Sequence, residues 1–170
     1  MNKFGVIGNP VDHSLSPIIH GEFAKEFDFD ITYEKILSPV EAFNLTAEKF
    51  ISDGSIGFNI TLPFKINAYS FSKDLTADAK AAGAVNTIKV DNNIIYGENT
   101  DGKGLVNDLK KNLKQTLQDK EILIIGAGGA TQGILKPLLD NNPEKILLAN
   151  RTKEKSLRLA NEFSKYGKVC

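Results

Sequence analysis

The chain has 170 residues, of which 41% are hydrophobic and 25% are charged. These values are ordinary for a globular protein, and the length allows one large domain or one domain and part of another. A single cysteine excludes an intramolecular disulfide, and that thiol with two histidines cannot build a zinc-type ligand cluster. No apolar run reaches the roughly 18 residues of a membrane span, and the start MNKFGVIGNP lacks the apolar region of a signal peptide. We therefore expect a cytoplasmic protein with no membrane partner.

The charge is balanced over the whole chain but not along it. Residues 1–100 contain 8 Lys and Arg against 13 Asp and Glu, whereas residues 101–170 contain 13 against 8. Two ordinary solvated surfaces would explain this asymmetry, and so would a phosphate-bearing ligand bound by the basic half. Nucleic acid is the weaker alternative, because no patch interleaves basic with aromatic residues. We expect small-molecule partners and no nucleic acid.

Strands and helices are predicted to alternate in the first part of the chain. The apolar stretch 3–8 predicts a buried strand, and Ser16 followed by Pro17 is typical of a helix start with Ser16 as its N-cap. Further strands are expected over 31–37, 56–62, 84–90 and 94–97, and further helices over 40–52, 65–81 and 101–117. This order predicts an α/β domain.

Two local patterns add detail to this domain. Ile19, Phe23 and Phe27 recur every four residues and give the first helix an apolar face. The sequence DNN at 91–93 separates two short strand patterns and predicts a hairpin turn.

A second α/β pattern begins near residue 120. The apolar stretch 121–125 predicts a strand, and the glycine-rich segment GAGGATQG follows it at 126–133. A helix to about residue 139, a strand over 145–150, a helix over 153–165 and a further strand from 166 are then expected. The fold class is therefore an α/β domain followed by the first half of a Rossmann-like domain, with the boundary near residue 100.

The glycine-rich segment is a candidate pyrophosphate site. The standard spacing G-x-G-x-x-G would place a third glycine at 131, where Thr131 stands, and the glycine comes at Gly133 instead. A merely tight turn between strand and helix would also need glycines. The strand before it and the βα unit after it favour dinucleotide binding, with the phosphates on the helix N-terminus. The residues expected to hold them are Gly126, Ala127, Gly128, Gly129 and Ala130.

The end of the next strand indicates which dinucleotide would bind. NAD-binding proteins place Asp or Glu there, to accept a hydrogen bond from the ribose 2′-hydroxyl. Here the strand ends in Asn150, Arg151 and Thr152, with Lys155 close behind. A guanidinium can hold a 2′-phosphate through paired hydrogen bonds, so NADP is favoured over NAD. The plainer interpretation is that Arg151 is an ordinary solvated arginine.

Polar residues also follow the predicted strands of the first part. Ser14 and Ser16 flank a helix start, where N–H groups favour an anion such as a carboxylate, although capping alone would also explain Ser16. Asn59 and Thr61 lie two residues apart and share a face at the end of a strand, and Lys65 follows them. Asn86 and Asp101 are likewise placed at element boundaries, where ligands of α/β sheets bind.

Six segments together resemble one enzyme family. GNPVDHSLSP, GFNITLPFK, AGAVNT, ENTDGKG, GAGGATQG and ANRT occur in the order of the motifs of shikimate dehydrogenases, from Gly5 to about Lys155. The related quinate/shikimate dehydrogenases share much of this pattern. The resemblance implies an enzyme that reversibly reduces 3-dehydroshikimate to shikimate with NADPH, in the biosynthesis of chorismate and the aromatic amino acids. It also implies a shikimate-binding catalytic domain over 1–100, and a linker helix with a partial NADP-binding domain over 101–170.

The resemblance also assigns roles to particular residues. Ser14 and Ser16 would bind the substrate carboxylate, and Lys65 with Asp101 would form the catalytic pair. Ring hydroxyls would be held by Thr61, Asn86 and Asp101, and Asn59 and Thr100 belong to the same substrate-binding motifs. The cofactor would be held by the five loop residues 126–130 and by Asn150, Arg151, Thr152 and Lys155.

Members of this family continue beyond the point where this sequence stops, into the second half of the cofactor domain and a terminal helix that returns to the first domain. We therefore expect the chain to be a fragment of a longer enzyme, which could form a homodimer. The alternatives are that the 170 residues act as a shikimate-binding module without turnover, or that the enzyme is a quinate/shikimate dehydrogenase.

Overall fold

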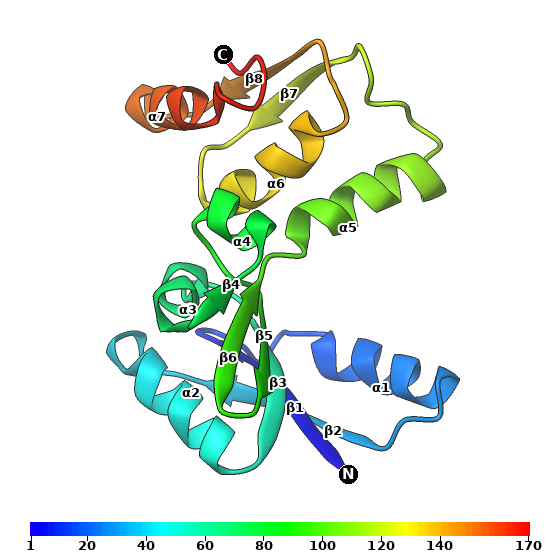
Figure 1. Cartoon of the computed structure of the whole chain (residues 1–170), viewed down its shortest axis with the longest axis vertical. Coiled ribbons are helices and arrows are strands. Elements are labelled where there is room, and N and C mark those ends of the chain that lie inside the picture. Colours follow the sequence, from blue (N-terminus) through cyan, green and yellow to red (C-terminus); the bar gives the residue numbers. More distant parts are fainter. The chain divides into compact units, whose positions relative to one another are not determined.

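The computed structural model describes residues 1–170. The chain divides into two compact units, each an α/β structure (Figure 1). Unit 1 comprises Met1–Thr76 and Ala84–Glu98, and unit 2 comprises Ala77–Gly83 and Asn99–Cys170. The predicted fold class is confirmed. None of the helices is long and apolar enough to cross a membrane.

Unit 1 contains six strands and three helices longer than one turn. They are β1 (Asn2–Gly8), α1 (Ser16–Glu26), β2 (Ile31–Leu37), α2 (Phe43–Ser52), β3 (Ser55–Ile60), α3 (Lys65–Phe71), β4 (Asp74–Leu75), β5 (Thr87–Asp91) and β6 (Ile94–Glu98). A 3₁₀ turn, Val40–Ala42, leads into α2. The strands form one sheet in the order β2-β1-β3-β5-β6-β4. β1 runs parallel to β2 and β3, whereas β5 is antiparallel to both β3 and β6.

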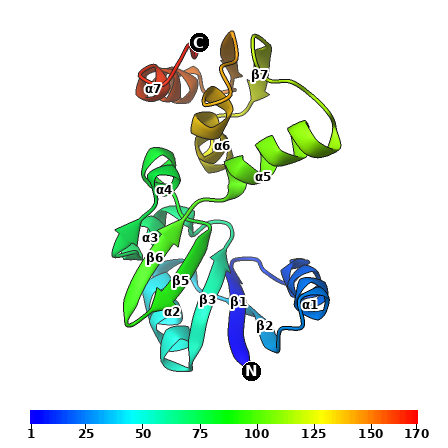
Figure 2. The ribbon, with the colours of Figure 1, turned by 45° about the vertical axis from the view of Figure 1, so that its right-hand side comes forward.

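Helices cover both faces of this sheet (Figure 2). Successive side chains of a strand point to opposite faces. Phe4 of β1 lines a groove with residues of α1, while a Cβ on the adjacent Gly5 would lie 3.0 Å from the ring of Phe50 in α2. α1 and α2 therefore pack on opposite faces. The α2 face holds a fully buried core in which the rings of Phe43 and Phe64 stack, with centroids 5.2 Å apart.

Three predictions for unit 1 were wrong in detail. The N-cap of α1 is Leu15, and Ser16 is the first helical residue. The single helix expected over 65–81 is interrupted, because α3 ends at Phe71 and the short strand β4 pairs with β6 before α4 (Ala77–Ala82) begins. The strand expected from residue 84 begins at Thr87.

The hairpin at residues 91–93 is confirmed. Asn92 and Asn93 have φ of 49° and 63° and connect β5 to β6. A two-residue hairpin turn with both residues at positive φ matches the twist of the strands, and asparagine tolerates that conformation.

Unit 2 has a two-stranded parallel sheet. Its elements are α4 (Ala77–Ala82), α5 (Asp101–Asn107), the π-helical turn Asp108–Asn112, β7 (Glu121–Ile125), α6 (Gly129–Leu139), β8 (Lys145–Ala149) and α7 (Lys153–Phe163). Its core includes Leu135, Ile146, Leu159 and Phe163. The helix expected over 101–117 ends at Asn112, and the last expected strand is reduced to one bridge between Ile146 and Val169.

Close packing of α5 on α6 depends on a glycine. A Cβ at Gly102 would lie 2.5 Å from Cγ of Pro137 and 2.8 Å from the carbonyl oxygen of Gly133. Pro137 lies inside α6, so the contact is with a rigid ring and with backbone, neither of which can move aside easily. Gly102 thus sets the distance between the two helices.

We predict that Gly102→Ala lowers the free energy of unfolding by about 1–3 kcal/mol, the usual cost of overpacking. Gly104→Ala in the same helix is the matched control, because a Cβ there meets nothing within 4 Å. That variant should gain about 0.5–1 kcal/mol from helix propensity. Urea unfolding followed by circular dichroism measures both, and equal stability of the two variants would contradict the packing argument.

Candidate functional site

Backbone pairing gathers the polar residues of unit 1 at one edge of its sheet. β5 runs antiparallel to β3, with Asn59 opposite Thr87, so the start of β5 lies beside the end of β3. The amide of Ile60 donates to the carbonyl of Asn86 over 2.8 Å, and the amide of Thr61 donates to the carbonyl of Ile7 in β1 over 3.0 Å. The predicted residues Asn59, Thr61 and Asn86 are therefore neighbours.

Lys65 is joined to the same edge by a tight turn. The amide of Phe64 donates to the carbonyl of Thr61 over 3.1 Å, across a Leu62–Pro63 peptide that is cis. Lys65 is then the first residue of α3, and its carbonyl accepts from the amide of Val85 over 2.9 Å. This places the backbone of Lys65 next to the segment that carries Asn86.

The two predicted serines lie at the start of α1. Ser14 is outside the helix, where its hydroxyl accepts from the amide of Ser16 over 3.3 Å and donates to the hydroxyl of Ser16 over 3.1 Å. The helix has no side-chain N-cap bond. The amide of Ser16 is bonded to Ser14, Pro17 has no N–H, and the amide of Ile18 donates to the carbonyl of Leu15 over 3.0 Å. The two serine hydroxyls are therefore the groups of this helix start that can bind an anion.

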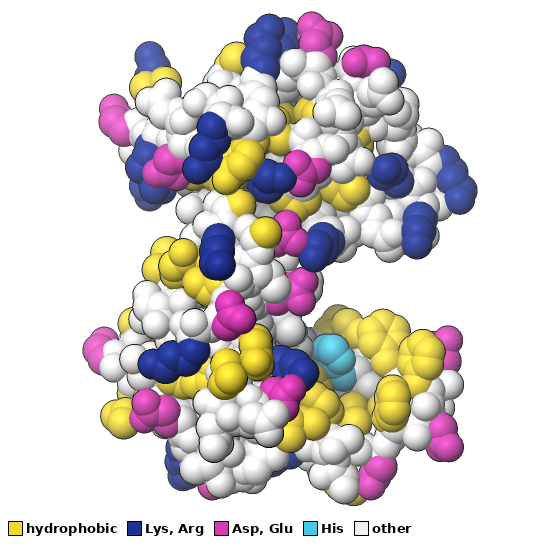
Figure 3. Space-filling model, in the orientation of Figure 1, with side chains coloured by type: hydrophobic (Ala, Val, Ile, Leu, Met, Phe, Trp, Pro, Cys, Tyr) yellow, Lys and Arg dark blue, Asp and Glu magenta, His cyan; other side chains and the backbone are white.

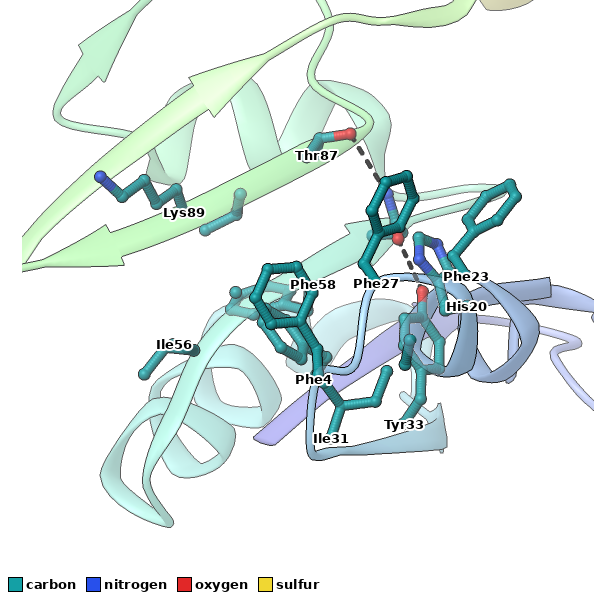
Figure 4. A pocket seen from close by; sticks show the side chains of 15 residues that line it. Phe4, His20, Phe23, Phe27, Ile31, Tyr33, Ile56, Phe58, Thr87 and Lys89 are labelled. Atoms are coloured by element: carbon teal, nitrogen blue, oxygen red, sulfur yellow. Dashed lines mark hydrogen bonds between the residues drawn. The ribbon is translucent and has the colours of Figure 1, made fainter. Parts of the chain in front are cut away.

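A continuous chain of hydrogen bonds connects the serines to the asparagines. Ser16 hydrogen-bonds the phenol of Tyr33, and the Tyr33 hydroxyl donates to Oδ1 of Asn59 over 2.6 Å. Nδ2 of Asn59 donates to Oγ1 of Thr87 over 3.2 Å, and the Thr87 hydroxyl donates to Oδ1 of Asn86 over 2.9 Å. Figure 4 shows the bonds from Tyr33 and to Thr87 as dashed lines. We call the series Ser14, Ser16, Tyr33, Asn59, Thr87 and Asn86 the hydrogen-bond relay.

Burial and stacking hold Tyr33 in this position. Burial raises the pKa of Tyr33 to about 12, against a smaller opposite effect of its hydrogen bond with Ser16. The imidazole of His20 in α1 stacks on the phenol, with ring centroids 4.5 Å apart and planes 8° from parallel. Burial also lowers the pKa of His20, while its hydrogen bond with Asn59 acts to raise it. At neutral pH both rings are therefore uncharged.

An apolar groove of about 440 Å³ lies beside the relay on the α1 face of the sheet. His20, Tyr33, Asn59, Thr87 and Lys89 form its polar lining, and the rest includes Phe4, Phe23, Phe27 and Ile31 (Figure 4). Phe23 and Phe27 of the apolar face predicted on α1 line this groove, and that face is not covered by another element. Ile19, Phe23 and Phe27 are 47%, 52% and 63% exposed, and hydrophobic side chains gather over this helix on the surface (Figure 3). Ser14, Ser16, Thr61, Lys65 and Asn86 do not line the groove, which adjoins the polar edge at Asn59 and Thr87.

In unit 2, the glycine-rich loop leaves space at a helix N-terminus. Gly126 has φ of 119°, a conformation that disfavours other residues, and Gly128 is the N-cap of α6. A Cβ at Gly128 or Gly129 would meet nothing within 4 Å, and both residues are exposed. An anion can therefore approach the unpaired N–H groups of the first turn of α6 closely.

The two departures from the standard glycine spacing have structural reasons. Thr131 is buried, and its hydroxyl donates to the carbonyl of Gly126 over 3.0 Å, which ties the helix to the turn. Gly133 faces α5, where an added Cβ would lie 3.2–3.5 Å from the side chains of Asn99 and Asp101.

The loop after β8 lies next to the glycine-rich loop. β7 and β8 are parallel neighbours with Ile125 opposite Ala149, and the amide of Gly126 donates to the carbonyl of Ala149 over 2.7 Å. The next residue, Asn150, bonds the carbonyl of Thr152 over 2.7 Å and shapes the turn. Arg151, Thr152 and Lys155 are exposed around this turn, and the cationic groups of Arg151 and Lys155 can reach an anion there.

Thr100 and Asp101 belong to unit 2, whereas Lys65 belongs to unit 1. Thr100 is the N-cap of α5, and the amide of Asp101 donates to Oδ1 of Asn99 over 3.1 Å. The pairing of Lys65 with Asp101 stays a prediction.

Two family models match the chain. The "Shikimate dehydrogenase substrate binding domain" matches residues 6–88, and "Shikimate / quinate 5-dehydrogenase" matches residues 108–169. The chain belongs to the shikimate dehydrogenase family. The polar edge of unit 1 lies within the first match, and the glycine-rich loop lies within the second.

Relatives of known name agree with this family membership. The chain is 56% identical to the shikimate dehydrogenase (NADP(+)) of Ruthia magnifica, over all of the chain and 64% of that protein. An Ael1 enzyme from Pseudomonas putida superposes with a TM-score of 0.93 at 36% identity, over all of the chain and 63% of that enzyme. Shikimate 5-dehydrogenase from Thermus thermophilus, in complex with NADP(H) and shikimate, superposes with a TM-score of 0.90 at 31% identity, again over all of the chain and 63% of that enzyme. The chain thus spans just under two thirds of the length of these relatives.

Sequence reasoning did not find Tyr33, His20, Thr87 or Thr131. Tyr33 is the one residue with a hydroxyl-bearing ring in the alternating strand ITYEKIL, which could have marked it as a buried phenol needing a partner. The contribution of Thr87 depends on the register between β3 and β5, which no local pattern encodes.

Proposed function

We propose that the complete protein is an NADP-dependent shikimate dehydrogenase that reversibly reduces 3-dehydroshikimate to shikimate. The observation that carries this proposal is the hydrogen-bond relay, which joins an anion-suited helix start to a set of amide and hydroxyl groups within one unit. Shikimate has that combination of a carboxylate and ring hydroxyls. A cytoplasmic location and a homodimer stay predictions.

The substrate would lie against the polar edge of unit 1. Ser14 and Ser16 would donate to its carboxylate, as hydroxyls beside a helix N-terminus readily do. Thr61 and Asn86 would bind ring hydroxyls, because their backbones meet at the ends of β3 and β5. Asn59 would support them from the same face, and Thr100 and Asp101 would complete the site.

Lys65 and Asp101 would carry the proton chemistry. Reduction of a ketone adds a proton to the oxygen and a hydride to the carbon, and the bound reduced nicotinamide would supply the hydride. Lys65 would donate to the oxygen or stabilise its developing negative charge, while the carboxylate of Asp101 orients the ammonium.

The glycine-rich loop and the turn after β8 would hold NADP. Residues 126–130 offer a glycine surface with free approach to the N-terminus of α6, which fits a pyrophosphate. None of the three residues directly after β8 (150–152) is a carboxylate, and Arg151 with Lys155 would pair with the 2′-phosphate.

The alternative is that the 170 residues act as a shikimate-binding module without turnover, because they match only 64% of the length of the Ruthia magnifica relative. A quinate/shikimate dehydrogenase is the other alternative, and the second family model includes both activities in its description.

Shikimate binding and turnover separate these hypotheses. We expect the 170-residue chain to bind shikimate in a calorimetric titration, because the relay lies wholly in unit 1. Absorbance of the reduced cofactor, followed after adding 3-dehydroshikimate and NADPH, should stay constant for this chain and fall for the complete enzyme. Turnover by a chain of verified mass would reject the inactive module, and absence of shikimate binding would reject the proposed function. Quinate in place of shikimate tests the remaining alternative.

Lys65→Ala in the complete enzyme should lower kcat roughly 100-fold or more, the range for a positioned acid–base group. Lys73→Ala is the matched control, because Lys73 is exposed just beyond α3 and should leave kcat unchanged. Lys65→Arg separates the two roles, since arginine keeps the charge but does not give up a proton. A Lys65→Ala enzyme with near-normal kcat would remove this residue from the mechanism.

Arg151→Ala should weaken NADPH binding by roughly tenfold or more and leave NADH binding nearly unchanged, because NADH lacks the 2′-phosphate. Arg158→Ala is the control, as Arg158 is ion-paired with Glu162 on the surface of α7. Fluorescence titration with each reduced cofactor measures the affinities. Equal losses for both cofactors would show that Arg151 does not contact a 2′-phosphate.

A further inference from the structure

The start of α5 packs on α6 at Gly133. A Cβ at Gly133 would lie 3.2 Å from Nδ2 and 3.3 Å from Oδ1 of Asn99, and 3.5 Å from Oδ2 of Asp101. A Cβ at Gly102 would in turn lie 2.8 Å from the carbonyl oxygen of Gly133. Three residues at the start of α5 therefore lie against one glycine of α6, and all of them belong to unit 2.

Asn99 holds the backbone of Asp101. The Asn99 side chain is buried, with 1% of the residue exposed, and its Oδ1 accepts a hydrogen bond from the amide of Asp101 over 3.1 Å. An asparagine that accepts from the amide two residues ahead stabilises a turn, and this turn sets the direction in which α5 begins. A closely packed side chain cannot shift without moving the groups bonded to it. The Asn99 side chain therefore connects the surface of α6 to the position of Asp101.

α6 is also the helix whose N-terminus would bind the pyrophosphate. Gly133 is the fifth residue of this helix, about 6 Å along its axis from Gly129. Thr131 lies between them and ties α6 to the glycine-rich turn through its bond to the carbonyl of Gly126. The surface against which Asp101 packs and the loop that would hold the cofactor are thus parts of one helix and its preceding turn.

We propose that Gly133 and Asn99 are positioning residues that hold the carboxylate of Asp101 in place for the reaction. Gly133 leaves the space that the side chains of Asn99 and Asp101 occupy, and Asn99 fixes the first turn of α5. A glycine at position 133, two residues later than the standard spacing, then serves Asp101 and not the phosphates. This role rests on the proposed function, in which the carboxylate of Asp101 orients the ammonium of Lys65.

Gly133→Ala in the complete enzyme tests this role. The added methyl group would displace the buried Asn99 by a few tenths of an ångström, and kcat/KM for shikimate should fall about five- to tenfold because Asp101 moves with it. The KM for NADP should stay within about twofold of wild type, since Gly133 lies outside the loop 126–130. Alanine favours a helix over glycine, so the fold should be retained. Gly104→Ala is the matched control, because a Cβ there meets nothing within 4 Å and should leave both values unchanged.

A second pair of variants tests Asn99. Asn99→Ala removes the acceptor for the amide of Asp101 and should lower kcat/KM for shikimate by about tenfold or more. Asn99→Ser returns a hydroxyl oxygen that can accept from the amide two residues ahead, and should recover about threefold or more of that loss. Serine fills little more space than alanine, so this recovery distinguishes the hydrogen bond from packing.

A double variant shows whether Gly133 acts through Asp101. In an enzyme that carries Asp101→Ala, the carboxylate is gone, and Gly133→Ala should lower kcat/KM by less than about twofold further.

Four results would overturn the proposal: an unchanged kcat/KM in Gly133→Ala, a rise in its KM for NADP that matches the fall in kcat/KM, no recovery in Asn99→Ser, or an undiminished effect of Gly133→Ala beside Asp101→Ala. If circular dichroism shows that the Asn99 variants do not fold, the Gly133 variants decide. Failure of the proposed function is a different result, because the complete wild-type protein would then not turn over shikimate, or Asp101→Ala would keep the wild-type kcat/KM.

Discussion

The antiparallel pairing of β5 with β3 is the constraint on which the polar edge of unit 1 depends. In an all-parallel sheet the start of β5 would lie at the far end from the carboxyl end of β3. The reversed direction brings Asn86 and Thr87 beside Asn59 and Thr61. Lys65 follows because its carbonyl is bonded to Val85, immediately before β5. A single choice of strand direction therefore assembles groups from three separate segments of the chain.

The relay converts that backbone arrangement into defined side-chain orientations. An asparagine amide can turn over at little intrinsic cost, so its donor and acceptor ends must be set by neighbours. Here Oδ1 of Asn59 accepts from the Tyr33 hydroxyl, while its Nδ2 donates to Oγ1 of Thr87 and to the backbone carbonyl of Asn86, which can only accept. The stacked His20 and half-buried Tyr33 limit the access of water, which would otherwise offer competing partners. Hydrogen bonds among side chains that project from the sheet therefore fix the orientation of these polar groups.

Local patterns in the sequence predicted the turns, strands and helix starts that depend on interactions between residues close together in the chain. The hairpin at Asn92 and Asn93, the strand 121–125 and the helix start at the glycine-rich loop were all predicted, because turn chemistry and periodicity act over a few residues. The break between α3 and α4 was missed, because β4 has two residues and exists through pairing with β6. The N-cap of α1 is Leu15, one residue before the predicted Ser16. The hydroxyl of Ser14, outside the helix, accepts from the amide of Ser16.

For the candidate site, the predicted residues are the ones whose chemistry shows in a motif, and the missed ones act through neighbours. Asn59, Thr61 and Asn86 could be read as polar groups at strand ends. Tyr33 could not, because its role depends on which strand lies next to β1. The role of Thr131 was likewise not evident from the motif, because it depends on the hydrogen bond from its hydroxyl to the carbonyl of Gly126.

The course of the chain between the two units has a consequence for dissecting the protein. The segment Ala77–Gly83 belongs to unit 2, although sequence on both sides of it belongs to unit 1. The polypeptide therefore passes from one unit to the other three times, and no single cut yields either unit whole. Cleavage after Glu98 would carry α4 away on the wrong piece, with Ala79 and Ala82 stripped of the packing that buries them. Separate expression of either unit would therefore require joining two segments that are not consecutive in the sequence.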